Sequence, residues 1–326
     1  MFPFGKKTPS KTLSRVKTTF HSVFAVIVLS AFVLGISYFV RELSLLTPTK
    51  LAAVSQPVLD KLGVSNETAG EVAGEFAKRA EPPAAVEAPK SVEEEKEALF
   101  SIAVFADVHS DLENLRAAVS KTRDLEINTV FLLGDETDLG VPKDLAAVKK
   151  VMDDSVLTYY ALPGDRDLYD TVGQQAFLDV FGVNYHSVGI GGKKFVLLDN
   201  SANFTIVLGN LIDWFVREVA DADFVLLSQP LYHPSNDKVM GVVDGEEDAA
   251  VRKQALELLD VIRASPVVAV VAGDHHMSST SPDPVDTQLT HYVVGAITRE
   301  RNLQPPRFGV LTIFTDGDYE VKDVVL

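Results

Sequence analysis

Short apolar runs alternate with amphipathic segments from about residue 99 to residue 326. The short apolar runs predict buried strands over 100–105, 130–133, 156–162, 195–198, 224–227 and 267–271. Apolar residues at helical spacing predict helices over 112–122, 142–152, 208–219 and 247–262. Two further runs, 310–314 and 319–325, flank Asp316-Gly317, which is typical of a hairpin turn. Strands and helices mixed in this way predict an α/β layered domain over residues 99–326.

The N-terminal part of the chain has a different pattern. Residues 1–19 are basic and contain no acidic residue, and residues 20–40 carry no formal charge apart from the titratable His21. A helix needs about 20 apolar residues to cross a membrane. We therefore expect one transmembrane helix over 20–40, with a cytoplasmic N-terminus and the rest of the chain on the other side. A cleaved signal peptide is the alternative, but its apolar region is usually shorter, about 7–15 residues.

Residues 41–98 are rich in Ala, Glu, Pro and Val and include the acidic run Glu93 to Glu95. This composition is typical of a linker that buries too little apolar surface to fold. The whole chain has a net charge of −16 and no cysteine. The charge argues against nucleic acid as a partner, although bound divalent cations can reverse the local field around an anionic substrate. The absence of cysteine excludes disulfides and thiolate metal ligands.

Clusters of acidic residues, histidine and glutamine follow five of the predicted strands. In chain order, the clusters contain Asp107 and His109, then Asp135 and Asp138, then Asp165 to Asp167, then Gln229, and finally Asp274 to His276. Ligands of layered α/β sheets bind beyond the carboxyl ends of the strands, so these clusters are expected to meet at one site. Carboxylates and imidazoles are ligands for Zn, Mn and Fe, and carboxylates also suit Mg and Ca. Two such ions about 3.5–4 Å apart can clamp the attacking and leaving oxygens of a phosphoryl transfer.

The order of these clusters resembles the calcineurin-like metallophosphoesterase family, whose motifs are D-x-H, G-D-x-x-D, G-N-H-D, a lone His and G-H-x-H. The first two motifs are intact here as Asp107-x-His109 and Gly134-Asp135-x-x-Asp138. The later motifs depart from the pattern, as Gly164-Asp165-Arg166-Asp167 and Gly273-Asp274-x-His276. The resemblance covers residues 99–326 and implies a four-layer sandwich, with two packed mixed sheets flanked by helices.

The resemblance also implies two divalent metal ions, which the sequence does not identify among Mn, Fe, Zn and Mg. The first ion would take Asp107, His109, Asp135 and His276, with Asp135 shared between both ions. The second would take Asp165, Gln229 and Asp274 in addition to Asp135. His233 is an alternative to Gln229, and His275 is an alternative to His276 if the last motif is shifted by one residue. A second site so rich in oxygen would favour Mn or Mg over Zn.

Arg166 and Asp167 are the candidate catalytic residues. Arg166 stands where the family has a histidine that is often assigned to protonating the leaving group. Arginine does not readily release a proton, but it can bind a phosphate oxygen and stabilise developing charge. Asp167 and Asp138 are expected to orient the metal ligands through hydrogen bonds without binding the metal themselves.

These features predict a membrane-anchored, metal-dependent hydrolase of phosphomonoester, phosphodiester or diphosphate bonds. Its substrate would be a phosphorylated small molecule or a lipid-linked phosphate. The altered second set of ligands leaves an alternative open: a catalytically impaired module of the same fold that binds metal or phosphate.

Overall fold

The computed structural model describes residues 96–326, which lie within one compact unit, Glu93–Leu326. The predicted basic segment 1–19, the predicted transmembrane helix 20–40 and nearly all of the predicted linker lie outside these residues. Within 96–326, no helix is both long and apolar enough to cross a membrane.

The first sheet has five strands in the order β13-β12-β1-β2-β3. Its parallel centre is formed by β1 (Ala98–Phe105), β2 (Thr129–Leu133) and β3 (Thr158–Leu162). β12 (Arg307–Phe314) runs antiparallel to β1, and β13 (Tyr319–Val325) closes the predicted hairpin. The strand predicted over 156–162 begins two residues late, because Val156 ends the preceding helix in a left-handed conformation with a φ of 64°.

The second sheet has six strands in the order β10-β11-β9-β6-β5-β4. Its parallel strands are β5 (Lys193–Leu198), β6 (Phe224–Leu227), β9 (Ala269–Ala272) and β11 (Thr290–Val293). The antiparallel edges are β4 (His186–Ile190) and β10 (Ser279–Pro282). A small ribbon, β7 (Val242–Val243) with β8 (Glu246–Glu247), stands apart from both sheets.

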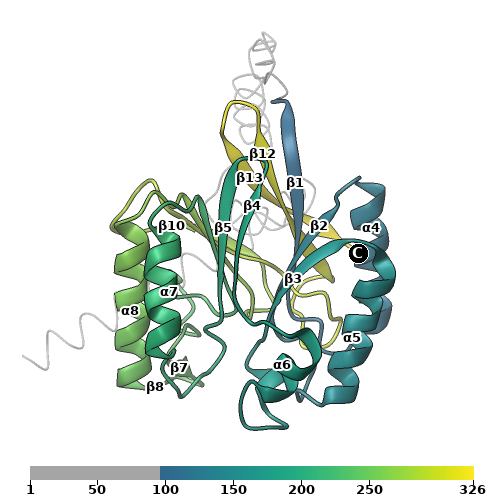
Figure 1. The fold of residues 1–326 in the computed structure, drawn as a ribbon, viewed down its shortest axis with the longest axis horizontal. Helices are drawn as coiled ribbons and strands as arrows, with labels where there is room; N and C mark the ends of the chain where they lie inside the picture. Colours follow the sequence, from purple (N-terminus) through teal and green to yellow (C-terminus); the bar gives the residue numbers. More distant parts are fainter. Residues whose placement is uncertain (1–95) are drawn as a thin grey trace, which may run out of the picture. The chain divides into compact units, whose positions relative to one another are not determined.

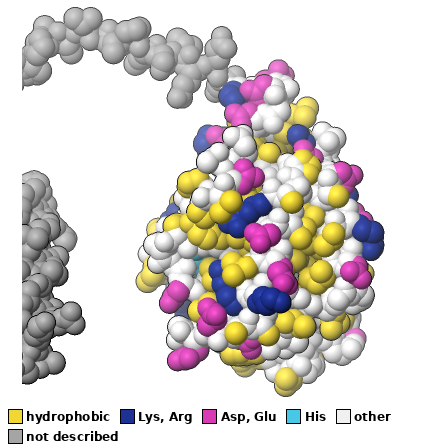
Figure 2. Space-filling view, turned by 90° about the vertical axis from the view of Figure 1, so that its left-hand side faces the viewer, with side chains coloured by type: hydrophobic (Ala, Val, Ile, Leu, Met, Phe, Trp, Pro, Cys, Tyr) yellow, Lys and Arg dark blue, Asp and Glu magenta, His cyan; other side chains and the backbone are white. Residues whose placement is uncertain are grey.

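Helices cover the outer face of each sheet (Figure 1). α4 (Leu112–Asp124) and α5 (Pro142–Ser155) pack on the first sheet, and α7 (Gly209–Val219) and α8 (Ala249–Arg263) pack on the second. α6 (Gln175–Phe181) and the 3-10 turn Arg166–Leu168 lie between β3 and β4 in the chain. Figure 2 shows the face that carries α7 and α8, where acidic and basic side chains are interspersed with apolar ones, as expected of a solvated surface.

Alternating side chains of the central strands fill two different cores. Ile102 and Val104 of β1 belong to the core between the sheets, together with Phe195 and Leu226 of the second sheet. Ala103 and Phe105 of β1 instead belong to the core beneath α4 and α5. Because both faces of β1 are buried from Ile102 to Phe105, this part of its sequence is a continuous apolar run. The architecture is therefore a mixed α/β fold in which two sheets pack together and helices flank them.

Candidate metal centre

The loops after β1 and β2 continue the pairing of the two strands beyond their ends. The amide of Asp107 donates to the carbonyl of Gly134 at 3.1 Å, and the amide of His109 donates to the carbonyl of Asp135 at 2.9 Å. Ser110 donates in the same way to Glu136 at 3.0 Å. Three residues of the predicted ligand set are thus placed by main-chain hydrogen bonds before any side-chain contact is considered.

Five predicted ligand residues have the left-handed backbone conformation, which side chains other than glycine rarely adopt. Their φ angles are 53° for Asp107, 46° for His109, 54° for Asp135, 74° for Asp274 and 54° for His276. Each such residue costs about 1–3 kcal/mol and persists only where the surrounding structure fixes it. Strain concentrated in this way is a property of functional sites.

The structure brings Asp107, His109, Asp135 and His276 together, with one ligand atom of each within 4.8 Å of the others. The Nε2 atoms of His109 and His276 face each other at 2.9 Å. Nε2 of His109 lies 3.6 Å from Oδ2 of Asp135, and Nε2 of His276 lies 3.6 Å from Oδ1 of Asp107. We call these four residues the first ligand set.

Each histidine of the first ligand set has an acceptor on its outer nitrogen. Nδ1 of His109 lies 3.1 Å from Oδ1 of Asp138, and Nδ1 of His276 lies 3.3 Å from the carbonyl oxygen of Arg301. Carboxylate and carbonyl oxygens accept hydrogen bonds, so each Nδ1 carries the proton and each neutral ring turns the lone pair of Nε2 inward. Two facing lone pairs repel each other, and a cation coordinated by both Nε2 atoms would relieve this repulsion.

The electrostatics of the first ligand set also fit a bound cation. Burial and the neighbouring Asp274 hold the pKa of Asp107 well above its ordinary value, and burial with Asp165 does the same to the pKa of Asp135. Burial lowers the pKa of His109 to about 3, so its imidazole is neutral at ordinary pH. Oδ2 of Asp107 is buried and has no hydrogen-bond partner within residues 96–326. The set has the donors of a transition-metal site, namely two imidazoles and two carboxylates.

A second ligand set consists of Asp135, Asp165 and Asp274, whose carboxylate oxygens also lie within 4.8 Å of one another. Asp135 therefore belongs to both sets, and its Oδ1 accepts a 3.0 Å hydrogen bond from the amide of Arg166. Asn203 donates to Oδ2 of Asp165 at 2.7 Å, while the buried Oδ1 of Asp165 has no hydrogen-bond partner among the described residues. The side chains of this set offer oxygen alone, which suits a hard cation.

The remaining candidate ligands lie close by in different surroundings. Gln229 is buried, and its amide nitrogen donates to the carbonyl of Ser201 at 2.9 Å and to Oδ1 of Asn203 at 2.7 Å. His233 accepts the amide of Asn236 on Nδ1 at 2.9 Å, and its Nε2 lies 3.0 Å from the hydroxyl of Ser279. Both ring nitrogens of His233 therefore have partners within its own loop and β10.

Asp167 holds the loop after β3 against the loop after β2. It is fully buried and accepts hydrogen bonds from the amides of Glu136, Thr137 and Gly164 and from the hydroxyl of Thr137. Burial raises the pKa of Asp167 to about 6 although these hydrogen bonds lower it. Gly164 is needed at the same junction, because a Cβ there would lie 2.0 Å from Oδ1 and 2.1 Å from the amide nitrogen of Asp135.

A cavity of about 780 Å³ opens beside the second ligand set and is lined by Asp165, Gln229 and Asp274. Arg166 and Lys238 line it as well, so two cationic side chains face the space next to the carboxylates. The guanidinium of Arg166 lies 5.1 Å from the ring centre of Tyr169, and its Nε lies 3.8 Å from Oδ1 of Asp165. A phosphate group fits this combination of charge and space.

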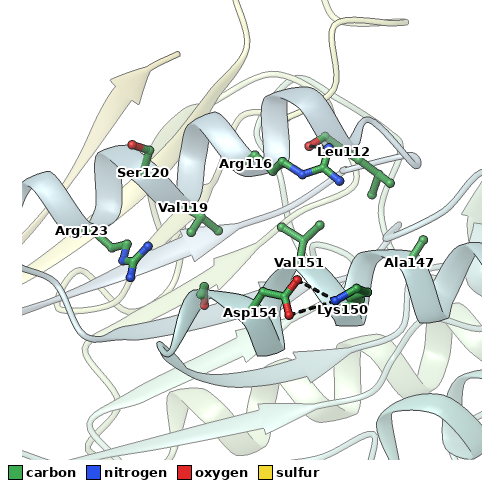
Figure 3. A pocket seen from close by; sticks show the side chains of 10 residues that line it. Leu112, Arg116, Val119, Ser120, Arg123, Ala147, Lys150, Val151 and Asp154 are labelled. Carbon is green, nitrogen blue, oxygen red and sulfur yellow. Dashed lines mark hydrogen bonds and ion pairs between the residues drawn. The ribbon is translucent and has the colours of Figure 1, made fainter.

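Another cavity, of about 370 Å³, lies between α4 and α5 (Figure 3). Arg116, Arg123 and Lys150 line it, and Lys150 is paired there with Asp154 at 2.9 Å. Its floor is apolar, with Val119 and Val151 at the junction of the two helices. This cavity lies on the helical face of the first sheet, whereas the candidate ligands lie at the strand ends.

Three residues that contact the candidate metal ligands could not be identified from the sequence. Asn203 reaches Asp165 from the segment after β5, and Arg301 offers its carbonyl to His276 from the segment before β12. Lys238 reaches Asp274 from the loop after β6, with Nζ 2.9 Å from Oδ1. Each comes from an irregular loop that is distant in sequence, so neither periodicity nor local spacing could have identified it.

A family model described as calcineurin-like phosphoesterase matches residues 100–278. A search of curated proteins gave no match. Among solved structures, the chain is similar to a dimetal phosphatase from Danio rerio, with 15% identity, coverage of 70% of this chain and 99% of that chain, and a TM-score of 0.53. It is also similar to a purple acid phosphatase from yellow lupin (Lupinus luteus) seeds, with 14% identity, coverage of 69% of this chain and 51% of that chain, and a TM-score of 0.55. At these identities the similarity shows a shared fold.

Proposed function

This chain belongs to the calcineurin-like phosphoesterase family, and on that premise we propose that it is a metal-dependent hydrolase of phosphoester bonds. The observation that carries the proposal is the first ligand set, in which two Nε2 lone pairs and an unpartnered carboxylate oxygen converge. The set lies at the strand ends, where Asp135 also belongs to the second set. The other two members of the second set, Asp165 and Asp274, line the cavity together with Arg166.

The first ligand set would hold a divalent ion through Asp107, His109, Asp135 and His276. When bound, such an ion supplies a Lewis acid and lowers the pKa of water at the site. The second ligand set, Asp135, Asp165 and Asp274, would interact with a second positive charge. Asp135 is the residue common to both sets.

Arg166 would bind a phosphate oxygen in the cavity and stabilise negative charge as it develops in the transition state. Its backbone position is fixed by the hydrogen bond from its amide to Asp135, and its guanidinium packs against Tyr169. Because a guanidinium keeps its protons, Arg166 contributes charge and orientation and does not protonate the leaving group.

For the substrate, we propose a phosphorylated small molecule or a lipid-linked phosphate that carries a monoester, diester or diphosphate bond. The support for an apolar portion is a group of apolar side chains that line the same cavity as Asp165 and Asp274. Tyr169, Val172 and Phe204 line it with 48%, 94% and 70% of their surface exposed. Exposed apolar side chains beside a charged site suit an amphiphilic ligand.

We also propose attachment to a membrane through residues 20–40, with residues 96–326 on the outer side. The support is the uncharged run over 20–40 directly after a basic segment. The proposal is tested by extracting a membrane fraction with alkaline carbonate. A chain that remains with the lipid would support the anchor, and a chain released by carbonate would contradict it.

The activity is tested on the full-length chain loaded with Mn²⁺, using p-nitrophenyl phosphate and bis-p-nitrophenyl phosphate. We expect turnover of at least one ester, and loss of that turnover in Asp135→Ala. Asp154→Ala is the matched control, because Asp154 is exposed on α5 and pairs with Lys150. A chain that binds metal but turns over neither ester would instead favour the catalytically impaired binding module.

A further inference from the structure

The second ligand set has an unusual balance of charge. Together, the two ligand sets contain four carboxylates, namely Asp107, Asp135, Asp165 and Asp274. With all four ionised, a single divalent ion in the first set leaves two negative charges. Lys238 and Arg166 supply two positive charges at the second set: Lys238 contacts Asp274 and Arg166 lies beside Asp165. Arrays of buried carboxylates require such compensation.

The contact between Lys238 and Asp274 is directional. Nζ of Lys238 lies 2.9 Å from Oδ1 of Asp274 and 2.9 Å from the carbonyl oxygen of the same residue. The ammonium therefore engages a carboxylate that belongs to the second ligand set. It also lines the cavity together with Asp165 and Arg166, so it faces the same space in which a phosphate group would bind.

The loop that carries Lys238 is fixed by the two histidines that the sequence left as alternative ligands. Nε2 of His275 donates to the carbonyl oxygen of Lys238, and the amide of Lys238 donates to Oδ1 of Asn236 at 3.0 Å. His233 accepts the amide of Asn236 and is anchored to Ser279 on β10. The rings of His233 and His275 meet edge to face with their centres 5.1 Å apart. Both histidines thus position the lysine.

We propose that the ammonium group of Lys238 is the second cation of the centre, so that the chain binds one divalent ion in the first ligand set instead of two. The inference rests on the proposed function for its role in phosphoester chemistry, since Lys238 and Arg166 would then face the phosphate group together. The binding stoichiometry that it predicts is measured independently of turnover.

The test measures the metal content of the full-length chain after equilibration with Mn²⁺ and removal of free ions. We expect one Mn²⁺ per chain in the wild type and two in Lys238→Met, which keeps the length of the side chain without its charge. Removing a positive charge next to a carboxylate should tighten binding of the second ion by on the order of tenfold or more. Lys238→Arg keeps the charge and should bind one ion.

Electron paramagnetic resonance of the same samples provides a second readout, because two coupled Mn²⁺ ions give a spectrum different from that of one isolated ion. The wild type should give the isolated spectrum and Lys238→Met the coupled one. Lys253→Met is the matched control: Lys253 is an exposed lysine on α8 that pairs with Glu257, and its loss should leave one ion bound.

Two Mn²⁺ per wild-type chain, or one in both the wild type and Lys238→Met, would overturn the inference. These outcomes differ from failure of the proposed function. A wild-type chain that binds two ions and hydrolyses the esters refutes the role of Lys238 alone. A chain that binds one ion, gains a second in Lys238→Met and hydrolyses neither ester supports the role of Lys238 and refutes the hydrolase.

Discussion

The Nε2 atom of His109 lies 2.9 Å from the Nε2 atom of His276, although the two residues are 167 positions apart in the chain. Both rings are held from outside through Nδ1, by Asp138 and by the carbonyl of Arg301. The inner nitrogens therefore cannot turn away from each other without breaking an outer hydrogen bond. The facing lone pairs repel each other, and a cation coordinated by both nitrogens would relieve that repulsion.

Asp107→Asn should stabilise the metal-free protein at neutral pH by about 1–3 kcal/mol. Burial and Asp274 keep the pKa of Asp107 in the folded protein well above the ordinary 3.8. As the pH rises above 3.8, the unfolded chain ionises first, so wild-type stability falls, whereas the variant has no charge to bury. Thermal unfolding in EDTA should show that the difference in free energy of unfolding between Asp107→Asn and the wild type grows from pH 4 to pH 7.5.

The control for that comparison is Asp154→Asn, an exposed position on α5, which should change stability by less than about 0.5 kcal/mol. With Mn²⁺ at 100 times its dissociation constant, the free energy of unfolding of the wild type should rise by about 2.7 kcal/mol. Asp107→Asn should lose most of that gain. A metal-free variant that melts below the wild type at pH 7.5 would contradict the prediction.

Asp138→Ala should weaken metal binding about 10–100-fold without removing a ligand. The Asp138 carboxylate fixes the proton of His109 on Nδ1 and directs Nε2 toward the site. Isothermal titration of the metal-free protein with Mn²⁺ measures the effect. Asp138→Asn keeps an oxygen acceptor and should fall between the wild type and the alanine variant. Equal affinities for all three proteins would show that Asp138 does not orient the ring.

Arg166→Ala should lower kcat by about 10²–10³-fold while leaving metal content unchanged. Arg166→Lys should recover little of the loss, because a lysine cannot present two parallel donors to phosphate or stack on Tyr169 in the same way. Steady-state kinetics with both p-nitrophenyl esters, together with metal analysis, check this expectation. Arg217→Lys, on the exposed side of α7, is the control. Wild-type activity in Arg166→Ala would remove Arg166 from the phosphate site.

Gly164→Ala should destabilise the protein by about 1–3 kcal/mol or more and reduce metal binding. The added methyl group would overlap the backbone and the carboxylate of Asp135, which cannot both move without separating the loops after β2 and β3. Gly189→Ala is a suitable control, because an added Cβ at that position in β4 meets no atom within 4 Å in the described structure. Thermal unfolding and metal content measure both variants, and unchanged values for Gly164→Ala would refute the proposed close contact.

Elements with a strong apolar pattern were predictable from the sequence. β6 has the predicted bounds, and β1, β2 and α7 differ from theirs by one or two residues. The missed elements have weak patterns. α6 spans only seven residues, from Gln175 to Phe181, and β10 is a polar edge strand that ends in Pro282. Such segments take their conformation from the neighbours on which they pack, which local periodicity does not contain.

The residues of the site also divide into those that the sequence could predict and those that it could not. The convergence of the clusters that contain the first ligand set could be predicted because each cluster follows a predicted strand, and parallel strands place their ends at one edge. The assignment of these four residues to one ion came from the resemblance to the family. The surroundings of Gln229 and His233 depend on the path of a long loop. Their spacing in the sequence therefore could not decide which of the two is the metal ligand. Lys238 was missed because its contact with Asp274 arises from the path of that loop and the two histidines that fix it.

The ladder of main-chain hydrogen bonds that continues from β1 and β2 into the ligand loops has a consequence for metal preference. Neighbouring strands lie about 4.8 Å apart whatever occupies the site. The gap between Asp107 and Asp135 is therefore set when the two strands pair, before an ion enters. The centre behaves as a template of fixed width, and ions of different radius meet the same opening. An ion whose radius does not suit that width binds less well, so the pairing of β1 and β2 adds a preference for ion size to the preference for imidazole nitrogen and carboxylate oxygen.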